Sequence, residues 1–329
     1  MKYFILIVSI VSGEIIFNFS GLLPVNETDQ RNFMRLDTGL DGNSYSRKYV
    51  RKKAYRIHMV GDSTTRNQWL ALCILLEPSK EQESTTRPVP SRQCIGEGWG
   101  YRRLIATGTF DYVKPIPASK MPQIIGVALN AYNISRFDAI YFGSTALHAL
   151  HLFPAFDKRG DTDWPIAVNF KQDVSEKINV VRRLTSCPIF QTMHYICDSL
   201  FTGEWAQAKH DNYGGNRTGL RSICRKRLPY AVQVCEDFSM TSEGSTKVAQ
   251  IERHGVESSN YPNIGVVDTF SLTYKQCWAT NDGRHYDKLL PLCLKSLSER
   301  IRACQRAPNK SSTSRYDEKK SKSDWENSN

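Results

Sequence analysis

The sequence predicts a single α/β domain built on a mainly parallel central sheet with helices on both faces. Its 329 residues are 40% apolar and 23% charged, which suits a globular protein with a substantial core. Strand-type and helix-type segments alternate along the chain, and no internal repeat interrupts them. In such folds the chemistry gathers at the carboxyl ends of the strands, which is where we look for a site.

The expected strands and helices follow one another between residues 47 and 305. Buried-type strands are expected at 55–60, 137–142, 188–196 and 264–270. Apolar residues at helical spacing predict helices over 64–76, 168–184 and 287–304. The first helix ends before Pro78, and the last closes the domain as an amphipathic helix.

The first twenty residues resemble a targeting segment. Lys2 precedes a short apolar run from Phe4 to Val11, and Ser12 and Gly13 follow it. A cleaved signal peptide over 1–20 is favoured over an N-terminal membrane anchor, because an anchor would place Glu14 in the bilayer. A polar stem over 21–46 and a disordered polar tail over 306–329 are expected on either side of the domain.

The cysteines and glycosylation sequons point to the same compartment. The chain has nine cysteines and no C-x-x-C pair, which predicts up to four disulfides and one free thiol in an oxidising lumen. Cys73 is the candidate free thiol, because it lies on the apolar face of a predicted core helix. Asn-x-Ser/Thr sequons occur at Asn18, Asn26, Asn133, Asn216 and Asn309. We therefore expect a secreted protein or one of the Golgi or ER lumen.

The excess of basic residues indicates which kinds of partner the protein binds. Lys and Arg number 44 against 33 Asp and Glu, a net charge of +11, which favours acidic partners such as uronic acids. No nucleic-acid partner is expected given the N-terminal signal, and a membrane is met only through a possible anchor. No cofactor and no metal are expected, since His148 and His151 have no carboxylate at ligand spacing.

The first chemical motif is Gly61-Asp62-Ser63, where a predicted strand meets a predicted helix. Gly61 permits a sharp turn, and the Ser63 hydroxyl then lies above the sheet with its own N–H at a helix N-terminus, where an oxyanion is stabilised. The alternative is that Asp62 or Ser63 only caps the helix, and these three residues alone leave the two readings about equal.

The second motif, Asp282-Gly283-Arg284-His285, precedes the last helix. An Asp three residues before a His in a turn can place its carboxylate against one imidazole nitrogen. The other nitrogen is then available to accept a serine proton. We expect Ser63, His285 and Asp282 to act as nucleophile, general base and orienting carboxylate.

These motifs resemble a known family. Gly61-Asp62-Ser63 with Arg66-Asn67-Gln68-Trp69, and Asp282-Gly283-x-His285-Tyr286, are similar to the first and last blocks of the PC-esterase group, which includes the plant trichome-birefringence-like polysaccharide O-acetyltransferases. Residues 267–273 and 137–150 resemble the intervening segments. The resemblance implies a three-layer SGNH/GDSL-like hydrolase fold, a Ser-Asp-His triad and acyl-ester chemistry on glycans.

The third block departs from that pattern. SGNH-type enzymes supply a glycine and an asparagine to the oxyanion hole, whereas this chain reads Phe142-Gly143-Ser144-Thr145. We expect Gly61, Asp62, Gly143, Ser144 and His148 to line the oxyanion or substrate site. For the second-block glycine, Gly100 and Gly108 remain alternatives, and Trp99 and Tyr101 are candidates for stacking on a sugar ring.

The predicted function is a serine-dependent acyl-esterase or O-acyltransferase, with acetyl as the expected acyl group, acting on glycans through an acyl-enzyme on Ser63. A transferase would also bind an acyl donor. The alternative is a catalytically inert, glycan-binding relative of the same fold, which the altered third block favours.

Overall fold

The computed structural model describes residues 7–11, 14–18, 54–77, 93–111, 116–146, 170–197, 200, 221–222, 224–225, 232–233, 240–259, 261 and 264–306. The N-terminal strands β1 (Ile7–Val11) and β2 (Glu14–Asn18) form an antiparallel pair. The predicted stem over 21–46 lies outside the described residues, as does the predicted tail beyond Arg306.

A six-stranded sheet forms the centre of the domain, in the order β4-β5-β3-β6-β7-β8. Its strands are β3 (Tyr55–Gly61), β4 (Cys94–Gly98), β5 (Tyr101–Phe110), β6 (Ala139–Gly143), β7 (Pro188–Gln191) and β8 (Gly265–Val267). All neighbours pair in parallel except β4, which forms an antiparallel hairpin with β5 at one edge. The carboxyl ends of β3, β6, β7 and β8 therefore lie at the same edge of the sheet.

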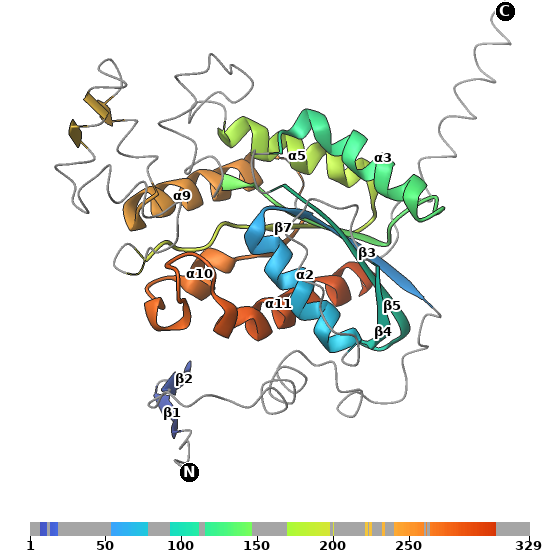
Figure 1. The fold of residues 1–329 in the computed structure, drawn as a ribbon, viewed down its shortest axis with the longest axis horizontal. Coiled ribbons are helices and arrows are strands. Elements are labelled where there is room, and N and C mark those ends of the chain that lie inside the picture. Colours follow the sequence, from blue (N-terminus) through green and yellow to red (C-terminus); the bar gives the residue numbers. More distant parts are fainter. Residues whose placement is uncertain are drawn as a thin grey trace, which may run out of the picture.

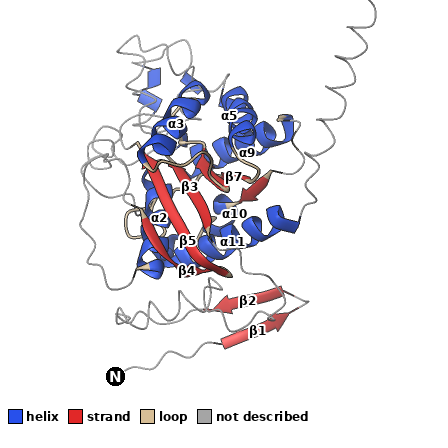
Figure 2. Cartoon of the chain, turned by 90° about the vertical axis from the view of Figure 1, so that its right-hand side faces the viewer, coloured by secondary structure: helices blue, strands red, loops and turns tan. Residues whose placement is uncertain are grey.

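Helices cover both faces of the sheet, as Figures 1 and 2 show. On one face lie α2 (Ser63–Leu76) and α11 (Leu290–Arg306), whose leucines pack against the sheet side chains of Ile57, Met59 and Tyr141. On the other lie α3 (Met121–Ala131), α5 (Phe170–Leu184) and α9 (Ser242–Ser258), which pack on Val60, Ile140 and Phe142. The predicted three-layer α/β architecture with a mainly parallel sheet is confirmed.

Short elements complete the domain. They are the helix α10 (Thr269–Thr273) and the 3-10 turns η1 (Ala118–Lys120), η3 (Cys277–Ala279) and η4 (Asp287–Leu289). The turns η3 and η4 lie on either side of the Asp282–His285 loop and lead it into α11.

Two predicted strands were too long. β8 ends at Val267 because Asp268 caps α10, its carboxylate accepting a hydrogen bond from the Ser271 N–H. β7 ends at Gln191, and the next residue leaves the sheet to contact α10, with the Thr192 hydroxyl accepting from the Phe270 N–H. The helices α3, α9 and α10 and the β4–β5 hairpin were not predicted.

The disulfides correct one prediction. Cys73 is not free, because it is bonded to Cys94 and joins α2 to β4 with a Cα–Cα distance of 5.3 Å. An apolar helix face suits a buried disulfide as well as a buried thiol. Cys187–Cys304 and Cys197–Cys277 are also formed, Cys224 is disulfide-bonded, and among the cysteines that the structure describes the free thiol is the buried Cys293. These disulfides indicate an oxidising compartment, secreted or lumenal.

The helices were also compared with what a membrane span requires. None of the helices in the described part of the chain has the length and apolar character needed to span a membrane.

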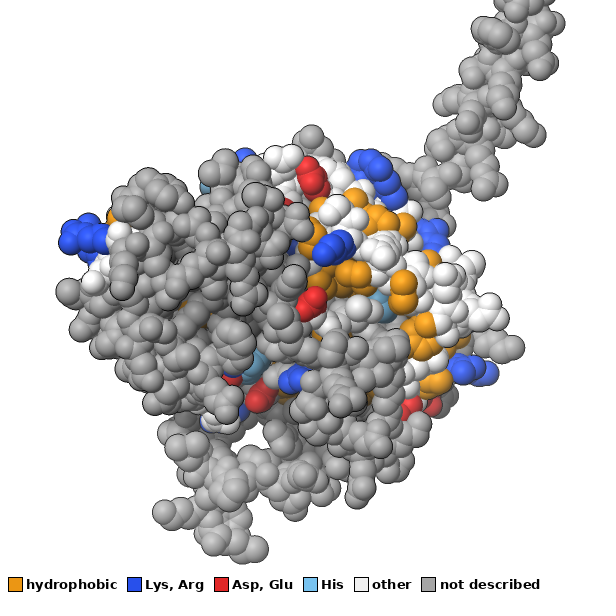
Figure 3. Space-filling view, turned by 45° about the horizontal axis from the view of Figure 1, so that its top comes forward, with side chains coloured by type: hydrophobic (Ala, Val, Ile, Leu, Met, Phe, Trp, Pro, Cys, Tyr) orange, Lys and Arg blue, Asp and Glu red, His pale blue; other side chains and the backbone are white. Residues whose placement is uncertain are grey.

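On the face drawn in Figure 3, Lys and Arg side chains occupy several separate places among apolar and uncharged residues. The positive charge visible on that face is therefore spread out.

Candidate active site

Ser63 is the first residue of α2, directly after the end of β3. A Cβ on Gly61 would lie 2.1 Å from Thr65 Oγ1 and 2.6 Å from Thr65 Cβ, so only glycine fits where the chain enters the helix. Gln191, at the end of β7, accepts a hydrogen bond from the Thr65 hydroxyl at 2.9 Å. This bond fixes the first turn of α2 above the carboxyl edge of the sheet.

Asp62 is the N-cap of α2. Its Oδ1 accepts hydrogen bonds from the Thr64 N–H at 2.9 Å and from the Thr64 hydroxyl at 2.7 Å, and the residue is buried. Of the two residues that the sequence offered as helix caps, Asp62 is therefore the cap. The Ser63 side chain beside it makes a different contact.

Asp282 and His285 lie in a tight turn between η3 and η4. Gly283 has a φ of +79°, a left-handed conformation that favours glycine. The turn brings Asp282 Oδ1 within hydrogen-bond distance of two backbone donors, the N–H groups of Arg284 at 3.1 Å and His285 at 2.8 Å. The carboxylate is thus fixed by the loop that it belongs to.

The two motifs meet through an unbroken series of hydrogen bonds. His285 Nδ1 lies 2.5 Å from Asp282 Oδ2, and His285 Nε2 lies 2.8 Å from Ser63 Oγ, although 222 residues separate the serine from the histidine. Burial acts to raise the pKa of Asp282, but the hydrogen bond and charge of His285 outweigh it and hold that pKa well below its usual range. Asp282 is therefore an anion at neutral pH and orients the imidazole.

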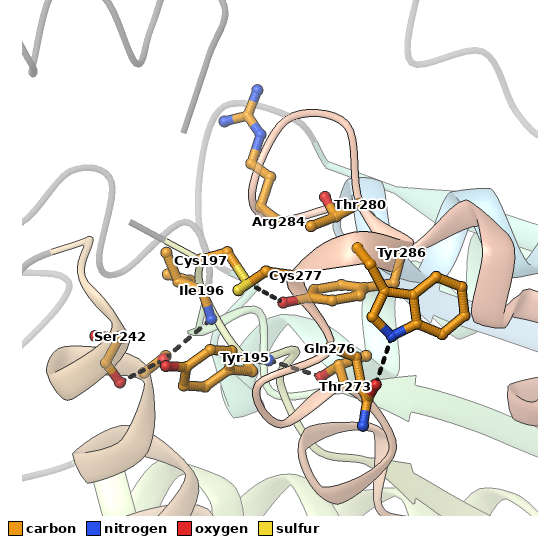
Figure 4. Close-up of a disulfide and its surroundings, with 12 residues drawn as sticks. Tyr195, Ile196, Cys197, Ser242, Thr273, Gln276, Cys277, Thr280, Arg284 and Tyr286 are labelled. Atoms are coloured by element: carbon orange, nitrogen blue, oxygen red, sulfur yellow. Dashed lines mark hydrogen bonds between the residues drawn. A yellow bond between two sulfur atoms is a disulfide. The ribbon is translucent and has the colours of Figure 1, made fainter. Parts of the chain in front are cut away.

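A disulfide anchors this loop to the sheet (Figure 4). Cys197 follows β7 and is bonded to Cys277 of η3, and the Cys197 N–H donates to the Gly283 carbonyl at 2.8 Å. Tyr286, next to His285, is buried with its hydroxyl 3.2 Å from Cys197 Sγ. The Asp-His loop is therefore bonded to the chain that leaves β7.

A buried chain of polar side chains joins the serine helix to the same loop. The Tyr141 hydroxyl of β6 donates to Gln68 Oε1 of α2 at 2.6 Å, and Gln68 Nε2 lies 3.5 Å from His194 Nε2. His194 Nδ1 is 3.3 Å from the Arg284 carbonyl. Burial lowers the pKa of His194 to about 4, so the ring is neutral and can accept from Gln68 while donating to Arg284. Sequence analysis missed His194, because it lay inside the strand predicted over 188–196, whereas β7 ends at Gln191.

The residues predicted to line the oxyanion or substrate site lie in different surroundings. The Ser63 N–H lies at the N-terminus of a 14-residue helix, where developing negative charge is stabilised. The Ser144 hydroxyl is buried and donates to Glu252 of α9, which corrects its expected role as an oxyanion donor. Gly143 ends β6, where an added Cβ would lie 3.2 Å from Thr65 Oγ1. His148 lies outside the described residues.

Thr145, next to Ser144, has a backbone conformation that is rare for its type. Its φ is +61°, a left-handed value that is costly for a β-branched residue. Its hydroxyl donates to the Ser144 carbonyl at 2.6 Å and accepts from the Ile116 N–H at 3.0 Å. The segment after β6 is therefore held in a strained turn.

The candidates in the β4–β5 hairpin lie at different distances along β5. Gly100 is in the β4–β5 turn, and Gly108 lies within β5 opposite Met59, so Gly100 is at the far end of the strand from Ser63. Trp99 and Tyr101 are buried core residues at that same turn, which excludes them from stacking on a sugar. Among the described residues, no group of three or more His, Cys, Asp or Glu is placed to bind a metal ion.

No protein-family model matches the sequence, and none of the curated proteins matches it. Among solved structures, the chain is similar to "a putative SGNH hydrolase from Slackia heliotrinireducens". The match has 13% sequence identity, covers 75% of this chain and 99% of the other, and has a TM-score of 0.37.

Proposed function

We propose that this protein is a serine-dependent acyl-esterase or O-acyltransferase that acts on acyl esters of glycans, with acetyl as the expected acyl group. The single observation that carries the proposal is the hydrogen-bonded series from Asp282 through His285 to Ser63, with distances of 2.5 Å and 2.8 Å. Nucleophile, base and orienting acid in this arrangement define acyl-transfer sites on unrelated folds.

In the proposed reaction, Ser63 Oγ attacks the acyl carbonyl carbon and its proton passes to His285 Nε2. The N–H of Ser63 stabilises the negative charge that develops on the carbonyl oxygen. The carbon–oxygen bond to the sugar then breaks, the sugar oxygen takes the proton from His285, and the acyl group remains on Ser63.

The second half depends on the acceptor. His285 removes a proton from water or from a sugar hydroxyl, and that oxygen attacks the acyl carbon of the acyl-enzyme. The bond between the acyl carbon and Ser63 Oγ then breaks, and Ser63 takes the proton back from His285. Water releases a carboxylic acid, which makes the protein an esterase, and a sugar hydroxyl receives the acyl group, which makes it a transferase.

The direct experiment is turnover of p-nitrophenyl acetate by the purified protein, with and without oligosaccharide acceptors. We expect release of nitrophenol by the wild type and a loss of at least roughly 1000-fold in Ser63→Ala, since removing a triad nucleophile abolishes the covalent route. Acetylated oligosaccharide in the products identifies a transferase. Equal rates for wild type and Ser63→Ala would overturn the proposal and favour the inert glycan-binding alternative.

A further inference from the structure

Trp278 is a large aromatic side chain that the proposed reaction does not use. It lies in η3 and is 50% exposed; the other large hydrophobic side chains exposed in the described part of the chain are Tyr274 and Val127. Leaving an indole half in water forgoes the burial that stabilises most tryptophans, so its exposure calls for an explanation.

The indole ring is held in place. Its Nε1–H donates to Gln276 Oε1 at 2.7 Å, and the backbone carbonyl of Trp278 accepts from Lys288 Nζ at 2.9 Å. The preceding residue, Cys277, is bonded to Cys197, and the following residue, Ala279, is buried. A ring fixed in this way loses little conformational entropy when a ligand stacks on it.

Trp278 is also close to the triad. Thr280, two residues further on, donates its hydroxyl to Asp282 Oδ1 at 3.3 Å. Trp278 and Asp282 therefore belong to the same short loop, with Thr280 between them in contact with the carboxylate that orients His285.

A positive charge accompanies the ring. Lys288 Nζ is 5.9 Å from the centre of the Trp278 ring, and its side chain is exposed. An ammonium has three donors, and one of them is directed to the Trp278 carbonyl. The pair therefore offers a flat apolar face beside a cation that can donate further hydrogen bonds.

We propose that Trp278 and Lys288 form a subsite for an anionic sugar unit of the substrate, which stacks on the indole while its carboxylate contacts the ammonium. The proposal rests on the proposed function for the reaction at Ser63. A protein partner fits less well, because a stable interface needs roughly 1,000 Å² or more of surface and this feature is a single ring with a charge.

The test is calorimetric binding of acidic hexasaccharides (hyaluronan, oligogalacturonate and oligoalginate) to the purified protein, with chitohexaose as the neutral partner of hyaluronan. We expect at least one acidic ligand to bind more tightly than chitohexaose. Trp278→Ala should weaken it roughly three- to tenfold, as expected for one aromatic stacking contact. Trp278→Phe should retain part of the affinity, and Lys288→Gln should reduce the preference for the acidic ligand.

Val127→Ala, at a 58% exposed position on α3, is the control and should bind like the wild type. Wild type that binds none of the acidic ligands, or Trp278→Ala that binds them unchanged, would overturn the subsite. Turnover of p-nitrophenyl acetate separates this outcome from failure of the proposed function. Wild type and Val127→Ala should turn over the small ester at the same rate, and sugar binding by a protein inactive on the small ester would leave the subsite standing without the catalysis.

Discussion

At the scale of single residues, Asp282 carries much of the geometry of the site. One carboxylate oxygen accepts two backbone N–H groups, and the other lies 2.5 Å from His285 Nδ1. The carboxylate can therefore select the imidazole tautomer with its proton on Nδ1, which leaves Nε2 free to accept from Ser63.

Replacing Asp282 by Asn should lower kcat for p-nitrophenyl acetate by roughly 1,000- to 10,000-fold with KM nearly unchanged, because an amide can stabilise the wrong tautomer. Steady-state kinetics measure this loss. A loss below tenfold in a variant that folds like the wild type would contradict the orienting role.

Gly61 carries a steric requirement. Gly61→Ala should cost roughly 1–3 kcal/mol of folding free energy and reduce turnover, because the added methyl group must displace Thr65 and with it the first turn of α2. Gly126→Ala is the matched control, since nothing lies within 4 Å of its Cβ position in α3, and it should be neutral or stabilising. Urea unfolding measures both, and equal stability of the two variants would refute the steric argument.

At the scale of elements, the site depends on keeping α2 at a fixed distance from the Asp-His loop. The buried chain from Tyr141 through Gln68 and His194 to the Arg284 carbonyl spans that distance. Asn67 of α2 also donates to Asp287 of η4 at 3.3 Å, on the exposed side.

His194→Phe keeps an aromatic ring at this position and removes both of its hydrogen bonds. We expect kcat to fall roughly 10- to 100-fold with little change in KM, since a small displacement of Ser63 from His285 is enough for such a loss. His194→Gln, which can still donate and accept, should recover part of the rate. Rates that follow thermal stability alone in both variants would show that His194 only packs.

Much of this arrangement could be predicted from the sequence, for identifiable reasons. Ser63 follows a strand that ends at Gly61, and the Asp282–His285 pair lies in a turn that contains Gly283. Glycines and helix-capping residues are signals that a sequence shows locally, so both positions could be found without the structure. Helix α9 was missed because its buried face is made of residues such as Ser245, Ala249 and Glu252 instead of an apolar stripe. The Cys73–Cys94 pairing and the burial of Ser144 depend on contacts between distant segments, which spacing does not reveal.

At the scale of the whole molecule, three buried titratable groups set the dependence of stability on pH. Burial lowers the pKa of His58 to about 3 and of His194 to about 4, and it raises the pKa of Glu252 to about 8. Lys177 acts on Glu252 in the opposite direction but does not outweigh burial.

These shifts predict maximum stability near pH 6.5. Below that pH the unfolded chain binds protons on both histidines while the folded protein does not, so stability falls toward pH 4. Above it, the folded protein keeps the Glu252 proton that the unfolded chain has released, so stability falls by roughly 2 kcal/mol between pH 6.5 and 8. Urea titrations across this range should show the maximum, and Glu252→Gln should flatten the alkaline side. A wild-type stability that rises from pH 6.5 to 8 would contradict the burial of a neutral Glu252.

The most direct test of the central claim, that Ser63 is a nucleophile activated by His285, is covalent labelling with a fluorophosphonate followed by peptide mass spectrometry. We predict one modified peptide, the one that contains Ser63, with labelling abolished in Ser63→Ala and strongly slowed in His285→Ala. No labelling of the folded wild type, or labelling that persists in Ser63→Ala, would contradict the account.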